Sequence, residues 1–134
     1  MTINALFPCA ETTEDVTVRV SVNFLPEQSE VQRGRWFWSY HIRIENGGVQ
    51  PVQLLTRHWE ITDGRGSIHI VDGEGVIGEQ PVIAPGASYD YVSGCPLTTP
   101  TGSMEGSYQM IRADGVSFDA VIPAFGLIAP VVRG

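Results

Sequence analysis

Histidines are the first side chains to consider in this sequence, because neutral imidazole is the commonest protein ligand for transition metals. His58 stands next to Trp59 and near Glu60, and His69 follows further along the chain. A tight turn at residues 63–66 would fold an extended chain back on itself and could bring the two imidazoles together. With Glu60 they could hold a soft divalent cation such as cobalt. No His-x-His or His-x3-His spacing supports this site, so we favour a packed Trp59 and a structural hydrogen bond from His58.

Three glycines, Gly73, Gly75 and Gly78, form a G-x-G-x-x-G pattern. In dinucleotide-binding folds this pattern lets a pyrophosphate approach backbone amides at a helix N-terminus, and it requires a strand before and a helix after. Pro81 and Pro85 disfavour a helix after Gly78. We therefore favour a glycine-rich connection between two sheets, with positive φ at one or more glycines. The alternative is a nest of amides that binds a nucleotide or pyrophosphate.

A long segment, residues 93–104, is rich in Gly, Pro, Ser and Thr and is expected to form a loop. Loops on rigid sandwiches commonly carry binding residues, which makes Cys95, Ser103 and Glu105 candidates for contacts with a partner. Cys95 has no evident basic neighbour to activate its thiol, and Ser103 lacks the G-x-S-x-G pattern of a nucleophile elbow. We expect a turn-rich corner with Cys95 buried as a small apolar group, and a binding loop without catalysis is the alternative.

Two segments with alternating apolar and polar residues must supply much of the scaffold for these groups. Every second residue is apolar in residues 16–24 and again in residues 36–45, where the apolar positions begin with Trp36 and Trp38. This period of two predicts β-strands with one buried face. Phe37 lies on the opposite register, so it marks either a strand packed on both faces, which we favour, or an exposed partner site.

Turn signals and further apolar runs predict about seven strands and no amphipathic helix. The expected fold is an all-β, immunoglobulin-like antiparallel sandwich of the fibronectin type III kind, without a bridging disulfide. We expect one domain over residues 1–134, with its core at about 14–127, a flexible N-terminal arm and a Pro-punctuated C-terminal tail. The arm is residues 1–13, the tail is residues 123–134, and the other expected strands are residues 52–63, 67–71, 82–83, 88–92, 106–112 and 116–122.

The composition limits the classes of partner. The chain has fifteen acidic and eight basic residues, for a formal net charge of −7. So few cationic side chains argue against nucleic acid and against an anionic membrane surface, whereas a basic protein, a cationic peptide or a cation would fit. No apolar run is long enough to span a bilayer and no secretory signal is evident, so we expect a cytoplasmic protein without membrane insertion. Cys9 and Cys95 are then expected to be free thiols.

Several blocks of the sequence resemble the ApaG domain family. They are IRIEN (42–46), VQLLTRHW (52–59), ITD (61–63), GEGVIGEQP (73–81), Pro85-Gly86, YVSGCPLTTP (91–100) and GSMEGSYQM (102–110). The resemblance covers roughly residues 17–127 and implies a fibronectin-like sandwich with no established enzymatic activity. It also implies an association with cobalt resistance and magnesium transport, and similar domains occur in eukaryotic F-box and polymerase-interacting proteins.

These observations together predict a binding or adaptor domain with no catalysis and no cofactor, whose partner is a protein. One alternative is a nucleotide- or pyrophosphate-binding protein that uses Gly73, Gly75 and Gly78 to hold a small anionic ligand. Another is a divalent cation binder that uses His58 and His69. Pairing of edge strands could also give a homodimer.

Overall fold

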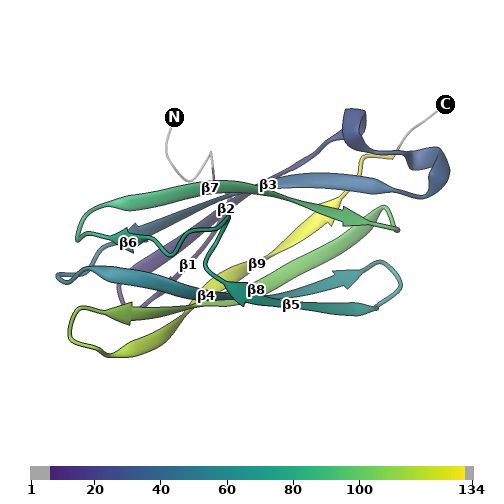
Figure 1. Cartoon of the computed structure of the whole chain (residues 1–134). Coiled ribbons are helices and arrows are strands. Elements are labelled where there is room, and N and C mark those ends of the chain that lie inside the picture. The colour runs from purple at the N-terminus through teal and green to yellow at the C-terminus, as the bar shows by residue number, and fades with distance from the viewer. Residues whose placement is uncertain (1–6, 132–134) are drawn as a thin grey trace.

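The computed structural model describes residues 7–131, which form two antiparallel β-sheets packed face to face (Figure 1). One sheet has the order β1-β2-β3-β7, and the other has the order β5-β4-β8-β9 with β6 also paired to β4. Apart from two short 3-10 turns, η1 (Pro26–Gln28) and η2 (Val31–Arg33), the described residues contain no helix. The strands are β1 (Cys9–Thr13), β2 (Val16–Phe24), β3 (Trp36–Asn46), β4 (Val52–Asp63), β5 (Ile68–Glu74), β6 (Val82–Ile83), β7 (Ser88–Leu97), β8 (Thr101–Arg112) and β9 (Ser117–Ile128).

The predicted all-β sandwich is confirmed, and the period-two alternation explains its core. Val18 of β2 is paired with Ile44 of β3, and neither side chain is exposed to solvent. Between the sheets, the ring of Tyr40 on β3 lies 5.4 Å from the ring of Trp59 on β4 and 6.0 Å from the ring of Phe125 on β9, measured between centroids. Such aromatic contacts join the two sheets because each large ring buries much apolar area. No helix in residues 7–131 is long and apolar enough to cross a membrane.

The predicted loose arm is wrong for the residues that can be described. Cys9–Thr13 forms strand β1, paired antiparallel with β2 from Cys9↔Val20 to Thr13↔Val16. The Thr13 hydroxyl also accepts a hydrogen bond of 3.1 Å from the Val121 amide of β9. This strand was missed because its residues are polar and mostly exposed, so backbone pairing rather than a buried face holds it. Residues 1–6 of the expected arm and residues 132–134 of the expected tail lie outside the described residues.

The predicted long loop at residues 93–104 is also wrong, because strands β7 and β8 occupy most of it. Only residues 98–100 form the bend between them. Pro96 is tolerated because β7 is the edge of its sheet, where one side of the strand needs no ladder hydrogen bonds. Thr99 secures the bend: its hydroxyl donates to the Thr101 carbonyl at 2.8 Å and accepts from the Gly64 amide at 2.9 Å.

Strand β9 continues past its predicted end at residue 122 because of an irregularity in the β8–β9 pairing. The register shifts between Met104 and Gly106, so that Gly106 faces Ile122 while Met104 faces Phe125. The buried positions of β9 change parity there, which hides the strand from a search for strict alternation. Pro123 lies inside this irregularity, where an interrupted ladder tolerates a residue without an amide hydrogen.

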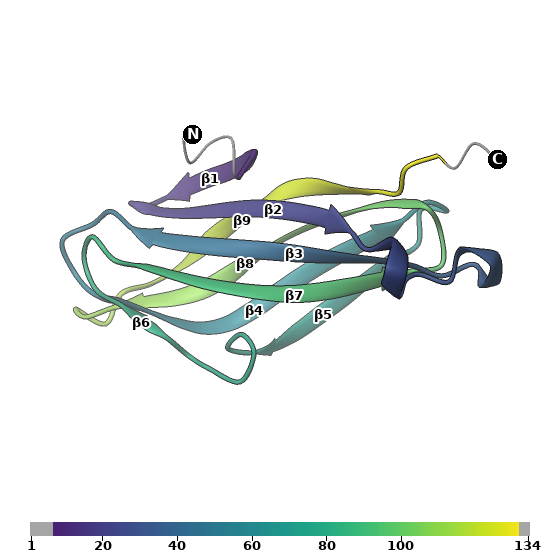
Figure 2. The same ribbon diagram turned by 90° about the horizontal axis from the view of Figure 1, so that it is seen from above.

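The two long sides of the sandwich differ (Figure 2). On one, which we call the closed side, β1 and β2 lie against β9. On the other, the open side, the sheets end in the unpaired edges of β7 and β5. β5 and β6 both pair with β4, one after the other along the same strand. The segment between them is therefore a detour along one sheet, and the predicted crossing between sheets is wrong for this segment.

Candidate functional site

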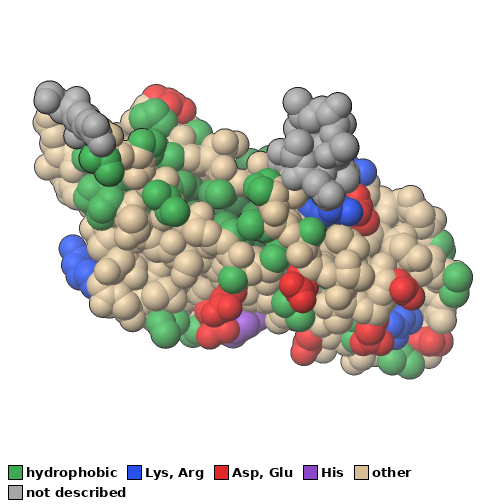
Figure 3. Space-filling model, turned by 180° about the vertical axis from the view of Figure 1, so that it is seen from behind, with side chains coloured by type: hydrophobic (Ala, Val, Ile, Leu, Met, Phe, Trp, Pro, Cys, Tyr) green, Lys and Arg blue, Asp and Glu red, His purple; other side chains and the backbone are tan. Residues whose placement is uncertain are grey.

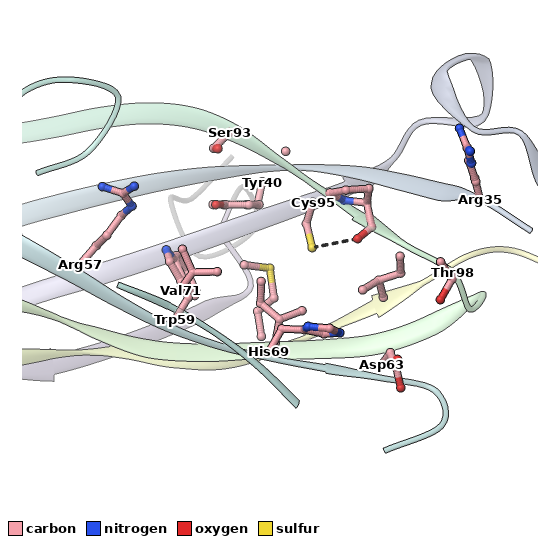
Figure 4. A pocket seen from close by; sticks show the side chains of 15 residues that line it. Arg35, Tyr40, Arg57, Trp59, Asp63, His69, Val71, Ser93, Cys95 and Thr98 are labelled. Atoms are coloured by element: carbon pink, nitrogen blue, oxygen red, sulfur yellow. Dashed lines mark hydrogen bonds between the residues drawn. The ribbon is translucent and has the colours of Figure 1, made fainter. Parts of the chain in front are cut away.

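A cleft of about 730 Å³ opens between the two sheets on the open side (Figure 4). Trp59 and Ile61 of β4 and Val71 of β5 form one wall, and Cys95 and Leu97 of β7 form the other. These side chains face inward because each strand places alternate residues on the sandwich side of its sheet. Clefts of this size with largely apolar walls are typical of binding sites.

Arg57 stands at one end of this cleft, in a position fixed by a β-bulge. The β4–β8 register shifts between Leu54 and Thr56, so the inward parity changes from residues 52 and 54 to residues 57, 59 and 61. The Arg57 guanidinium donates from Nη1 to the carbonyls of Glu74 at 3.0 Å and Gly75 at 2.8 Å. It is thereby held by backbone carbonyls rather than by a carboxylate.

Two hydroxyl groups lie near that guanidinium. Tyr40 of β3 and Ser93 of β7 line the cleft, and their side chains are hydrogen bonded to each other. Burial raises the pKa of Tyr40, while the Ser93 hydrogen bond and the nearby positive charge of Arg57 oppose that rise. The hydroxyl therefore stays protonated near neutral pH, so this end of the cleft offers hydrogen-bond donors next to a cation.

The glycine-rich segment, residues 73–78, makes room for the Arg57 side chain through its backbone. Gly73 lies in β5 under the Arg57 guanidinium, and a Cβ at position 73 would stand 2.7 Å from Nη2. A Cβ at Gly75 would meet the Glu79 carbonyl oxygen at 2.1 Å, and its φ is 63°. Gly78, with φ 78°, follows Ile77 in a two-residue turn closed by backbone hydrogen bonds between Val76 and Glu79. The predicted positive φ values are confirmed.

An anion nest is poorly supported by the same segment. The Gly75 amide donates to the Leu55 carbonyl at 2.9 Å and the Val76 amide donates to the Glu79 carbonyl at 2.8 Å, so neither is free to bind phosphate. The carbonyls of Glu74 and Gly75 point at Arg57. β6 and then β7 follow Gly78, so the helix that a dinucleotide site needs is not found there.

His58 and His69 do not come together. The hairpin pairs His58 with Asp72 and Ile61 with His69, so the two imidazoles project from opposite faces of the sheet. His58 is on the outer face, where its Nδ1 lies 2.6 Å from Asp72 Oδ1 and Nε2 lies 3.7 Å from Glu60 Oε2. The hydrogen bond to Asp72 raises the pKa of His58, whereas His69 lines the cleft. The predicted proximity of the two histidines is wrong. His69 pairs with Ile61, three residues from His58, and in a strand an odd spacing places two side chains on opposite faces.

Metal ligands do not cluster elsewhere among residues 7–131: no group of three or more His, Cys, Asp or Glu side chains could hold an ion. The free thiols predicted for Cys9 and Cys95 are confirmed. Cys95 is buried, its Sγ donates to the Pro96 carbonyl at 3.8 Å, and burial raises its pKa to about 11. It therefore behaves as a small apolar wall residue with a weak donor, as the favoured interpretation expected.

The remaining residues of the predicted binding loop lie apart from Cys95. Ser103 and Glu105 are exposed on β8, on the opposite face of the strand from buried Met104. Phe37 is half-buried, and its ring covers Gly94, where a Cβ would stand 2.4 Å from the ring carbon Cζ. Packing thus accounts for Phe37, and a partner contact through these residues stays a prediction.

Sequence reasoning missed Arg57 as a site residue, along with Tyr40, Ser93 and Arg35. A signal was available for Arg57, because it shares the strand face of Trp59 and a charged residue on a buried face is uncommon. No comparable signal marks Arg35, which follows η2 and reaches the cleft only through the way the chain enters β3 (Figure 4).

Comparisons with known proteins agree with this architecture. The profile of the ApaG domain matches residues 26–112. A protein named ApaG from Bradyrhizobium sp. (strain ORS 278) is 57% identical over 118 residues, which are 88% of this chain and 91% of the relative. Another from Pseudomonas aeruginosa (strain UCBPP-PA14) is 53% identical over 121 residues, which are 90% and 96% of the two chains.

Solved structures show the same likeness. The crystal structure of a protein described as ApaA from Bordetella pertussis superposes with a TM-score of 0.85 and 42% identity, covering 88% of this chain and 96% of that one. The C-terminal domain of Wzt, at 9% identity and a TM-score of 0.55 over 93% of this chain and 79% of that one, shares the fold alone. From the family profile and these close relatives, the chain belongs to the ApaG domain family.

Proposed function

We propose that this chain is a non-catalytic binding domain that takes an extended segment of a partner protein into the cleft on its open side. The observation that carries the proposal is the cleft itself, about 730 Å³ with largely apolar walls, set between two strand edges that no strand of residues 7–131 covers. Free edges offer backbone hydrogen bonds to an added strand, and alternate side chains of that strand would enter the cleft.

The exposed apolar residues of β5 support this use of the open side. Ile68, Ile70 and Val71 are 61%, 52% and 39% exposed. Natural proteins usually protect such an edge with charge, proline or a covering element, since an apolar edge strand invites pairing. Val71 faces the cleft, whereas Ile68 and Ile70 lie on the outer face of the same edge strand. A partner strand added to this edge would cover apolar side chains on both faces.

The chemistry of the candidate nucleophiles supports binding rather than catalysis. Cys95, with a pKa of about 11, is a thiol and not a thiolate at neutral pH. His58 and His41 are bonded to Asp72 and Asp90. Neither imidazole is hydrogen bonded to a serine, threonine or cysteine within residues 7–131, so neither is placed as the base of such a nucleophile.

We assign the association of the family with cobalt resistance and magnesium transport to the partner protein and not to this domain. The cleft walls are largely apolar, and Arg57 is a cation, so the cleft suits a protein segment better than a metal ion. We place the domain in the cytoplasm as an adaptor whose partner handles the cation. The free thiols Cys9 and Cys95 suit a reducing compartment.

A displayed library of random dodecapeptides, selected against the whole chain, tests the proposal. Val71→Trp would fill the cleft from an edge strand that tolerates a large aromatic side chain. We expect selected peptides to bind this variant at least about tenfold more weakly by fluorescence anisotropy. Val92→Trp is the matched control, because Val92 is 58% exposed on β7 between the inward-facing residues 91 and 93 and so points away from the cleft. The proposal fails if no peptide is enriched, or if both variants bind like the wild type.

A further inference from the structure

We infer that the partner segment is acidic: the cleft is built to receive an extended peptide that carries carboxylates beside apolar side chains. The inference rests on the proposed function and specifies its ligand. It comes from the distribution of arginines, the only basic residue type among the eight basic positions.

Four arginines in residues 7–131 are paired with carboxylates. Arg19 lies 2.9 Å from Glu45, and Arg43 lies 3.0 Å from the same carboxyl group. Arg33 pairs with Glu30 at 3.6 Å and Arg112 with Glu14 at 2.8 Å. These charges lie on the outside of the sandwich and are already neutralised.

The other three arginines in that part of the chain, Arg35, Arg57 and Arg65, have no carboxylate within 4.0 Å. Arg35 and Arg57 line the cleft, and Arg65 contacts it only through a lining residue. Arg57 and Arg35 line its two ends (Figure 4). Arg65, from the turn between β4 and β5, donates to the hydroxyl of the lining residue Thr98 at 3.2 Å. In a protein of net charge −7, such a gathering of unpaired cations favours an anionic occupant.

The free donors at the Arg57 end suit a carboxylate. Nη1 of Arg57 is used by the carbonyls of Glu74 and Gly75, which leaves Nη2 and Nε. A carboxylate that reached these groups would form a charge-assisted hydrogen bond in a partly desolvated place, where such bonds are strong. Tyr40 and Ser93 supply hydroxyls beside it.

Asp63 is the one carboxylate among the lining residues, and one of its oxygens is hydrogen bonded within the β4–β5 turn. Its Oδ1 accepts from the amides of Arg65 at 2.9 Å and Ser67 at 3.0 Å, which closes the β4–β5 turn. Other acidic side chains are scattered over the face seen from behind, most of them in its lower half (Figure 3). The net charge of the chain predicted a basic partner, whereas the arginines of the cleft favour an acidic one. The side chains in contact with a ligand decide this preference, because the charges of remote side chains are screened.

The length of the cleft favours an extended peptide over a smaller anion. Its β7 wall runs from Ser93 to Thr98, which is about 17 Å in a strand. This matches five or six residues of extended chain, with one carboxylate near Arg57 and another near Arg35 and Arg65. Apolar side chains between them would meet Trp59 and Leu97.

The selected dodecapeptides give the test. We expect Asp and Glu to be enriched, and Lys and Arg depleted, relative to the unselected library. The tightest peptide is then synthesised with every Asp and Glu replaced by Asn and Gln. This amide form should bind the wild type at least about tenfold more weakly. In Arg57→Gln the affinities of the acidic and amide forms should differ by only about twofold. The double variant Arg35→Gln with Arg65→Gln should also reduce this difference in affinity, and it serves as a second test if Arg57→Gln folds poorly.

Arg112→Gln is the matched control, since it removes the same charge from an arginine outside the cleft that pairs with Glu14, and it should keep the full gap. If the amide form binds the wild type within about twofold while Val71→Trp still abolishes binding, the acidic ligand is wrong and the binding cleft stands. If Val71→Trp binds as well as the wild type, both proposals fail. Displacement of the peptide by glutamate alone at low millimolar concentration would also overturn the extended peptide, because a single carboxylate would then suffice.

Discussion

The closed and open sides of this sandwich use strands of similar length but complete the core in different ways. On the closed side, β1 and β2 lie against β9, and Ala120 and Ile122 of β9 are fully buried. On the open side, every residue of β5 except Gly73 is exposed, and the cleft enters between β5 and β7. A side that closes contributes to stability, and a side left open keeps apolar surface for a partner. Stability and binding should therefore respond to different substitutions.

The largest effect is expected from truncating one apolar residue on each side. Ile122→Ala removes a side chain that is 1% exposed, and should lower the free energy of unfolding by about 2–5 kcal/mol. Val71→Ala, on a side chain 39% exposed, should lower it by less than about 1 kcal/mol. Urea titration monitored by tryptophan fluorescence measures both values. Equal losses would show that the open side supports the core as much as the closed side does.

A smaller difference in stability between the two sides is expected from glycine-to-alanine substitutions. Gly94→Ala, on β7, places a Cβ 2.4 Å from Phe37 Cζ, so the ring must move, at about 1–2 kcal/mol. Gly126→Ala, on β9, meets only the Ile128 side chain at 3.5 Å and should be close to neutral. The loss from Gly94→Ala should shrink when Phe37→Ala is also present, as a double-mutant cycle by thermal unfolding would show. An unchanged loss would mean that Phe37 does not cover Gly94.

The smallest effect concerns the hydrogen bond that ties β5 to β4 on the open side. Asp72 raises the pKa of His58 above its ordinary value, so the protonated imidazole stabilises the folded state. This contribution is complete below the unfolded pKa of about 6.5 and is lost as pH rises through the higher folded pKa. Wild type should exceed His58→Gln in stability at about pH 5.5 and match it near pH 9, by less than about 1 kcal/mol since the pair is exposed. Urea titrations at both pH values check this sign, and a larger difference at pH 9 would contradict it.

The fold was largely predictable, and its errors have physical reasons. Alternation in residues 16–24 and 36–45 identified β2 and β3 correctly, because each has one mostly buried face. Strand β1 lacked such a face, β7 contained a proline that an edge strand tolerates, and β9 changed parity at Pro123. In each case, pairing with another strand overrode a local signal: β1 pairs with β2, β7 with β3 and β9 with β8.

The candidate site was less predictable than the fold. The sequence suggested that Gly73, Gly75 and Gly78 bind phosphate, but their backbone does not offer this. In the structure Gly73 makes room for Arg57, and Gly75 makes room for the Glu79 carbonyl. His58 and His69 were noticed as a pair and lie on opposite faces. Arg57 stands two residues before Trp59 in the sequence, and this spacing places both side chains on the inward face of one strand.

The sequence by itself determined which faces of the main strands are buried, since side-chain direction in a strand depends only on a residue's place in a period of two. Only the tertiary structure decided that Arg35 and Arg57 line one cleft and that Arg65 contacts a residue of its wall. That gathering depends on strand order, on the bulge at Leu55 and on which edges remain unpaired. These features are set by long-range packing between the sheets, which a short stretch of sequence does not encode.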